Sequence, residues 1–376
     1  MPAVKSTRAR ILAVVLLGLL PRFVRAEDAL STAFESWQED GGRIHVSTEE
    51  AFLEKDLTPD TKLKAMGVVD VIAGATPTGL PPATTGGQVP LATMHDRRNA
   101  GTLDVIHQFE GLNLDAGYSR SVESDYVSNG LSLNSLFDFN GKNTTLLLGL
   151  AGTSDNEKVF FQPQRATRRG RSIILGLTQV VDKNTSLTLD LTFSRETGYL
   201  GDPYRLIEQG GLAFLENRPA ERNQFIAFAG LNHAWPEWNG AVDASYRCYR
   251  DTYGISSHTL EVSWLQKFAA DRVMLQLGLR GMHQTAADFY HVDLNGTGIV
   301  PGALPDPDGP FFSSDYRLSR METLNLRVKL VWTVEPRRFF LDAGFARYLM
   351  RGLDHTTSSS AYADANLFSV GAKLCF

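Results

Sequence analysis

Strict alternation of apolar and polar residues recurs along almost the entire chain and constrains the fold more than any other feature. The clearest segments are residues 187–193, 260–264 and 324–332, where every second residue is Leu, Val, Phe or Trp. Successive side chains of a β-strand point to opposite faces, so each segment has one apolar and one polar face. The sequence therefore predicts an all-β protein.

Two architectures produce this pattern, a soluble sandwich with its apolar faces inward and a transmembrane barrel with its apolar faces outward. The connections between the segments favour the barrel. Short turns alternate with long loops, and this alternation is typical of outer-membrane barrels. The turns are expected at 110–112, 140–143, 182–184, 236–239, 269–272 and 334–337, and the loops at about 76–100, 154–170, 199–221, 289–321 and 351–363.

The number of alternating segments predicts the size of the barrel. About sixteen are present, of which the two near 30–38 and 43–53 are the weakest. We therefore predict one transmembrane antiparallel up-and-down β-barrel of about sixteen strands with no plug domain. Fourteen strands are possible if the N-terminal pair lies outside the wall.

The N-terminus has the three parts of a secretory signal peptide. Basic residues precede the apolar run Ile11–Leu20, and Pro21 and the small-residue site ending at Ala26 follow. Ten apolar residues are too few to span a membrane, so we expect cleavage after Ala26 rather than a membrane anchor. The expected organisation is a signal peptide at 1–26 and a barrel in the outer membrane at 27–376.

The C-terminus has the form of a terminal barrel strand. Phe368, Val370, Leu374 and Phe376 occupy alternate positions, and Phe376 is the last residue. This arrangement resembles the assembly signal that barrel-assembly machinery recognises in outer-membrane proteins. We therefore expect this machinery and outer-membrane lipid as partners. The formal net charge of −5 argues against a nucleic-acid partner.

Several stretches, scattered in order over nearly the whole chain, resemble the bacterial family called domain of unknown function 3570. They are Asp70 to Pro81, Glu123 to Tyr126, Gly198 to Arg205, Glu216 to Arg222, Tyr246 to Ile255, Gln284 to Tyr290, and Ser313 to Ser319. The resemblance implies an outer-membrane barrel and no established activity. Because some relatives are encoded near small lipoproteins and flavin-attachment proteins, it also leaves an envelope lipoprotein or redox partner open.

Placement in a barrel predicts which polar side chains line the lumen. If Val242, Ala244 and Tyr246 face lipid, the odd-numbered residues of that segment face inward. By the same phase, the predicted lumen-lining residues are Asp70, Asp104, Asp190, Asp243, Arg247, Tyr249, Asp251, Glu261, Arg280, Arg327 and Lys329. Such charges of both signs form either a selective constriction or ion pairs that fill the interior. Candidates for the mouth, from the long loops, are Tyr204, Arg205, Asp315 and Arg317.

Catalytic and metal sites are not predicted. Ser128 to Gly130 resembles a stretch of outer-membrane phospholipases, but their serine needs a histidine two positions earlier, where this chain has Tyr126. Asp293 opens a calcium-loop spacing, with further oxygens at Asp306 and Asp308, but Leu304 stands at the closing position. We expect no cofactor.

Three functions remain open on the sequence. The first is a porin-like channel or passive transporter for small solutes, with no catalytic residues. The second is a non-catalytic scaffold for an envelope lipoprotein or a redox partner. The third and least favoured is a barrel enzyme, which would need a histidine, a carboxylate and a nucleophile within hydrogen-bond reach at the rim.

Overall fold

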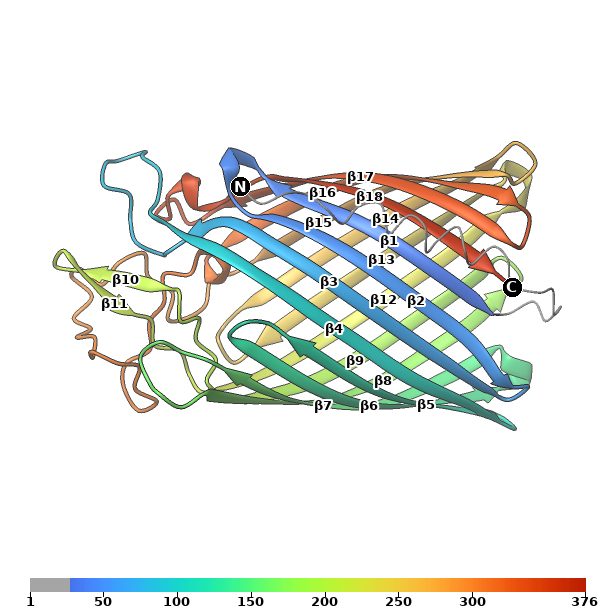
Figure 1. Cartoon of the computed structure of the whole chain (residues 1–376), viewed down its shortest axis with the longest axis horizontal. Helices are drawn as coiled ribbons and strands as arrows, with labels where there is room; N and C mark the ends of the chain where they lie inside the picture. The colour runs from blue at the N-terminus through green and yellow to red at the C-terminus, as the bar shows by residue number, and fades with distance from the viewer. Residues whose placement is uncertain (1–27) are drawn as a thin grey trace, which may run out of the picture.

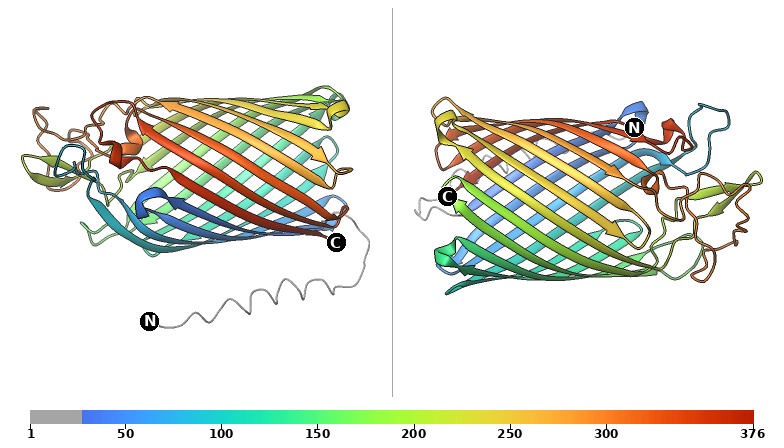
Figure 2. Two further views of the ribbon diagram at one scale, coloured as in Figure 1. Left: turned by 90° about the horizontal axis from the view of Figure 1, so that it is seen from above. Right: turned by 180° about the vertical axis from the view of Figure 1, so that it is seen from behind.

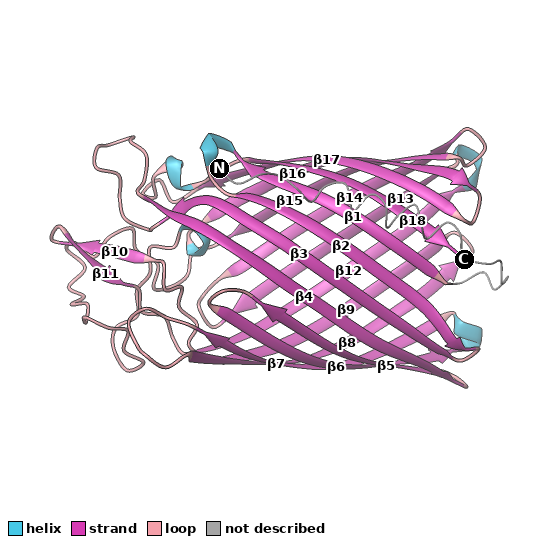
Figure 3. Cartoon of the chain, in the orientation of Figure 1, coloured by secondary structure: helices cyan, strands magenta, loops and turns pink. Residues whose placement is uncertain are grey.

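The computed structural model describes residues 28–376 as a closed antiparallel barrel of sixteen strands (Figures 1 and 3). Its wall consists of β1 (Ala29–Glu39), β2 (His45–Thr58), β3 (Thr61–Pro77), β4 (Leu91–Phe109), β5 (Leu112–Val122), β6 (Tyr126–Phe139), β7 (Thr144–Glu157), β8 (Ala166–Asp182), β9 (Thr185–Gly198), β12 (Glu221–Trp235), β13 (Gly240–Asp251), β14 (Ser256–Phe268), β15 (Val273–Gln284), β16 (Met321–Glu335), β17 (Phe339–Gly352) and β18 (Ala365–Cys375). The predicted signal peptide lies outside the described residues.

The N-terminal strands settle the strand number. The pair expected to be weakest forms β1 and β2, and β1 closes the barrel by pairing with β18 from Ala29↔Cys375 to Glu39↔Ala365. The barrel of sixteen strands is therefore confirmed, and the alternative of fourteen is wrong. Among residues 28–376, no helix is long and apolar enough to cross a membrane.

Short turns and long loops lie at opposite ends of the barrel, as predicted. The turns, of two to four residues, lie at the end that carries the C-terminus, which we call the terminal end. The long loops, 78–90, 158–165, 199–220, 285–320 and 353–364, lie at the other end, which we call the loop end (Figure 2). Three shorter connections, 40–44, 123–125 and 252–255, also lie at the loop end.

Two of the expected loops are shorter in the structure. β3 continues to Pro77 and β4 begins at Leu91, while β7 continues to Glu157 and β8 begins at Ala166. The outward residues of these extensions are mainly polar, such as Arg97, Asn99 and Arg169. The strands continue beyond the apolar belt with a polar outer face, so the alternation that marks them within the belt disappears.

The outer face of the wall carries the apolar side chains. On β9, Leu187, Leu189, Leu191 and Phe193 are 43–56% exposed, while the residues between them are more buried. Aromatic side chains follow this belt near the terminal end, where the ring centroids of Trp235 and Trp264 are 5.6 Å apart. Such a girdle is typical of a barrel in lipid.

The largest of the deeply buried apolar side chains, such as Tyr253, Ile207 and Leu294, lie in the loops and not in the wall. Loops 78–90, 199–220, 285–320 and 353–364 form what we call the loop cap, and the hairpin of β10 (Leu206–Gln209) and β11 (Leu212–Leu215) belongs to it. Ile207 and Leu294 are 0% exposed and pack with Phe312 in one small core of the cap. A second core joins Leu318 to Tyr249 of the wall. Loop 285–320 therefore reaches inward to the lumenal face.

Gly198 shows why a motif glycine stands where β9 leaves the wall. Its φ of 112° is strained for residues with a side chain, and a Cβ there would collide with the carbonyl oxygen of Thr167 on β8. Glycine allows β9 to remain close to β8 up to the point where the chain turns into the loop cap.

Candidate functional site

Five buried or partly buried charged side chains and one exposed arginine, Arg317, meet at the base of the loop cap. We call them the mouth network: Asp202, Arg205, Glu216, Arg218, Asp315 and Arg317. All six come from loops 199–220 and 285–320. Three arginines and three carboxylates balance one another, so the network ties the two longest loops together without excess charge.

Asp315 is the centre of this network. It is 1% exposed and accepts hydrogen bonds from Arg317 Nη2 at 2.6 Å and from Arg218 Nη2 at 2.8 Å. Burial alone would raise the pKa of Asp315, but Arg317, together with Arg205 and Arg218, outweighs burial and holds that pKa well below its ordinary value. Asp315 therefore stays ionised and holds the arginines in place.

The pKa of Glu216 is shifted in the opposite direction from that of Asp315. Its carboxylate is fully buried and accepts hydrogen bonds from Ser313 Oγ and from the backbone N–H of Asp202, both at 2.5 Å. Burial is the largest influence and raises the pKa of Glu216, against the attraction of Arg218 at 2.7 Å. The nearby charge of Asp315 acts in the same direction as burial.

Below the mouth network, side chains of the wall line a cavity of about 610 Å³. Arg222 donates to Asp251 at 2.5 and 2.8 Å, and Tyr249 donates to the same carboxylate at 2.6 Å. Arg247 and Arg280 also line the cavity. We call this space the arginine vestibule, since Arg168, Arg218 and Arg317 also border it.

The other predicted lumenal residues do not line the vestibule, and several of them form separate small clusters. Glu261 pairs with Arg327 and lies 3.9 Å from Arg280, and Lys329 Nζ lies 2.8 Å from Asp342. Asp70 is buried against Arg98 and Thr48. For Asp104, Asp190 and Asp243, no ion pair is found within residues 28–376.

The structure brings together three of the four predicted mouth residues. Arg205, Asp315 and Arg317 share the mouth network, with Arg205 Nε 4.0 Å from Asp315 Oδ1. Tyr204 lies apart, because its hydroxyl donates to Asp125 in loop 123–125. Sequence reasoning missed Arg168, Arg218 and Arg222. The inward phase of Arg222 on its strand was a usable signal, whereas Arg168 and Arg218 fall in stretches that were expected to be loops, where no periodicity places a side chain.

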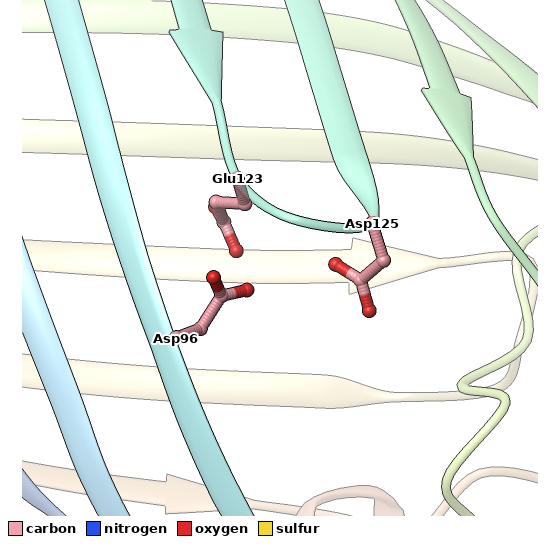
Figure 4. Close-up of side chains that lie close together, drawn as sticks. All are labelled: Asp96, Glu123 and Asp125. Carbon is pink, nitrogen blue, oxygen red and sulfur yellow. The ribbon is translucent and has the colours of Figure 1, made fainter.

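One carboxylate cluster has a spacing that suits a metal ion. Asp96, Glu123 and Asp125 offer oxygens within 4.8 Å of one another at the loop end of β4, β5 and β6 (Figure 4). Burial, and then the charges of Asp96 and Asp125, raise the pKa of Glu123. Asp96 also accepts two hydrogen bonds from Ser124, so the cluster is partly satisfied by the protein itself.

The calcium spacing noted in loop 285–320 does not assemble. Asp293 Oδ1 accepts from the backbone of Asn295, and Asp306 Oδ1 accepts from the backbone of Asp308. Both are local turns, and within residues 28–376 these carboxylates do not come together in a group of metal geometry.

The stretch that resembles phospholipases does not assemble a serine and its base either. The hydroxyl of Tyr126 accepts a hydrogen bond from Arg168, and Ser128 donates to Asp155.

The stretches that carry the family resemblance gather at the loop end. The mouth network takes its residues from Gly198–Arg205, Glu216–Arg222 and Ser313–Ser319, and Gln284 donates to the backbone carbonyls of Arg317 and Ser319. The stretch Glu123–Tyr126 supplies Glu123 and Asp125 of the acidic cluster, and its Tyr126 lines the vestibule. Stretches far apart in sequence therefore build one region.

The chain is similar to several solved structures. A bacterial polysaccharide outer membrane secretin is 9% identical over 94% of this chain and 100% of its own, with a TM-score of 0.49. A loop-deletion form of OmpT, an outer membrane protein of Vibrio cholerae, is 9% identical over 94% and 100%, with a TM-score of 0.45. CdiB from Acinetobacter baumannii is 8% identical over 94% of this chain and 61% of its own, with a TM-score of 0.53.

CdiB, with a TM-score above 0.5 and 8% identity, is informative about the fold alone. No protein in the search of curated sequences matches the chain. The family model described as "Protein of unknown function (DUF3570)" matches residues 19–167 and 158–369, which covers nearly the whole chain and confirms the resemblance. The chain is an outer-membrane β-barrel that belongs to the DUF3570 family.

Proposed function

We propose that the protein is a porin-like channel or passive transporter for small solutes. The observation that supports this most is the exposure of its inward-facing charges. The side chains of Arg327, Lys329 and Arg280 are 38, 44 and 46% exposed although they point into the barrel. An interior filled by ion pairs would bury them, so these side chains favour a water-filled lumen, as sixteen strands allow.

The vestibule gives the proposed channel its selective part. A solute entering below the loop cap meets Arg247, for which no ion pair is found within residues 28–376, and Arg280, which pairs with Glu261 only at 3.9 Å. Deeper in the lumen, Asp243 presents a negative charge on the same strand as Arg247. Charges of both signs along the path would set ion selectivity.

The test is single-channel recording of the refolded protein in a planar bilayer under a salt gradient. We expect stable conductance steps. Arg247→Gln should shift the reversal potential toward cation preference, and Asp243→Asn should shift it the opposite way, because each removes one lumenal charge. Lys183→Ala, an exposed residue of the turn between β8 and β9, is the matched control and should leave the potential unchanged.

An absence of conductance steps from correctly folded barrels would overturn the proposed channel. The non-catalytic scaffold would then be the favoured function. Conductance steps whose reversal potential is the same in both lumenal variants as in the wild type would overturn the assignment of Arg247 and Asp243 to ion selectivity. They would leave the channel itself in place. Heat-modifiable mobility on gels shows which preparations are folded.

A further inference from the structure

The outer face of β8 and β9 carries an unusual group of arginines at the loop end. Arg169 and Arg171 lie on β8, and Arg195 lies on β9 (Figure 1). All three are exposed and share the parity of Ile173 and Phe193, which belong to the apolar outer belt. They therefore point away from the lumen, and we call them the rim arginine cluster.

The strand register places two of these arginines side by side. Arg171 is directly opposite Arg195, and the next outward pair toward the terminal end is Ile173↔Phe193. Directly opposite residues have Cβ atoms about 4.5–5.5 Å apart, and like charges in such a pair are destabilising. A partner of negative charge would turn this repulsion into a binding site.

The protein supplies little of that negative charge. Arg195 pairs with Glu221 at 2.6 Å, but for Arg169 and Arg171 no ion pair occurs within residues 28–376. The residues of β7 directly opposite them are Ser154 and Gly152, which carry no charge. The cluster thus keeps two uncompensated positive charges on an outward surface.

Two outward arginines of β17 at the loop end are arranged differently. Arg347 is paired with Asp40 at 2.7 Å and with Asp364 at 3.1 Å, and Arg351 is paired with Glu322. On β17 the rim therefore neutralises its arginines. On β8 it does not do so for Arg169 and Arg171.

The height of the cluster corresponds to the membrane surface. Arg171 lies ten residues from Val181, the outward residue at the opposite edge of the belt on β8. Ten residues of strand rise about 33 Å, and a tilt of about 40° reduces this to about 25 Å, the height of the apolar band of an outer-membrane barrel. The guanidinium groups are therefore level with lipid headgroups.

We propose that the rim arginine cluster binds the phosphate of a lipid headgroup in the leaflet at the loop end, with the acyl chains of that lipid lying on Ile173, Phe193 and the belt below them. Guanidinium groups bind phosphate oxygens in a bidentate way, and the two uncompensated arginines, Arg169 and Arg171, lie on the same face of β8 and together suit one dianionic group. Basic side chains next to an apolar surface are the usual means of recognising anionic lipid. The proposal does not depend on channel activity.

The test uses the folded protein in phosphatidylcholine vesicles with and without lipid A that carries two phosphates. We expect the phosphorylated lipid to raise the midpoint of thermal unfolding by several degrees and to remain bound in native mass spectrometry. The double variant Arg169→Gln/Arg171→Gln should lose most of the shift and bind at least about tenfold more weakly. Dephosphorylated lipid A should give no shift.

The matched control is Arg272→Gln/Arg337→Gln, which removes two exposed charges from turns at the terminal end. It should keep the wild-type shift. An equal shift in the rim variant would overturn the proposal, and so would an equal shift with inorganic phosphate alone, which would indicate a site for a free anion. If the double variant does not fold, Arg171→Gln alone, compared with Arg171→Lys, makes the same distinction.

Discussion

Asp315 is the single side chain on which the loop cap depends most. It is buried and compensates Arg218 and Arg317, which come from two different loops. Removing one partner of a buried pair leaves an uncompensated charge and costs about 3–5 kcal/mol. We expect Asp315→Asn to raise hydrogen exchange in loops 199–220 and 285–320. Asp308→Asn, an exposed acid of the same loop, should not, and equal exchange in the two variants would contradict the role of Asp315.

The depressed pKa of Asp315 gives the cap a defined response to acid. A carboxyl whose folded pKa lies below its unfolded value of about 3.9 stabilises the fold above that value and loses this contribution as the pH falls toward the folded pKa. The protection of wild type over Asp315→Asn should therefore stay constant from about pH 5 to 8 and decrease below about pH 4. Hydrogen exchange corrected for intrinsic rates measures it; a decrease that begins near pH 6 would contradict the assignment.

At the scale of single residues, the sequence indicates which residue types lie at the mouth but not which of them contact one another. Arg205, Asp315 and Arg317 were candidates because they lie in long polar loops next to strand ends. Their contacts join residues about 110 positions apart, and loops have no periodicity that places one beside another. Lumenal residues such as Arg247 were predictable because strand alternation fixes the face on which each side chain lies.

The two faces of a single strand have opposite tolerances, and β9 allows a direct comparison. Leu191 is 51% exposed in the outer belt, while its neighbour Thr192 faces inward. An arginine near the middle of the lipid face costs about 2–4 kcal/mol, whereas an inward arginine meets water. Leu191→Arg should lower the free energy of unfolding in denaturant by about this amount, and Thr192→Arg should change it by less than about 1 kcal/mol. Similar losses in both variants would place β9 in a different environment.

The elements were most predictable where lipid dictates their pattern. Within the apolar belt, alternation of strongly apolar and polar residues marked the middle of β14, and together with the expected turns and loops it located the ends of β9 and β16 to within two residues. At the loop end, β4 and β8 continue with polar residues on both faces, as at Arg97 and Arg169, so their starts were placed about ten and five residues too late. The N-terminal β2 was weak for a related reason, since its outward face includes Glu49 and Lys55.

At the scale of the whole molecule, wall and loop cap are stabilised by different forces. The wall closes on itself through sixteen hydrogen-bonded strand pairs, and β10 and β11 pair only with each other. The cap has its own small apolar cores, such as the one formed by Ile207, Leu294 and Phe312. Disrupting a cap core should therefore loosen the mouth without opening the barrel.

Ile207→Asp tests this separation, because it places a charge in a site that is 0% exposed. A carboxylate cannot stay ionised there without a partner, so hairpin β10–β11 should leave its place. If the cap narrows the channel, conductance should rise and fluctuate more, while heat-modifiable mobility stays that of a folded barrel. Leu212→Asp, a 65% exposed position of the same hairpin, is the control and should conduct like wild type. Unchanged conductance in Ile207→Asp, with increased hydrogen exchange in the cap, would mean that solutes do not pass through the mouth that this hairpin covers.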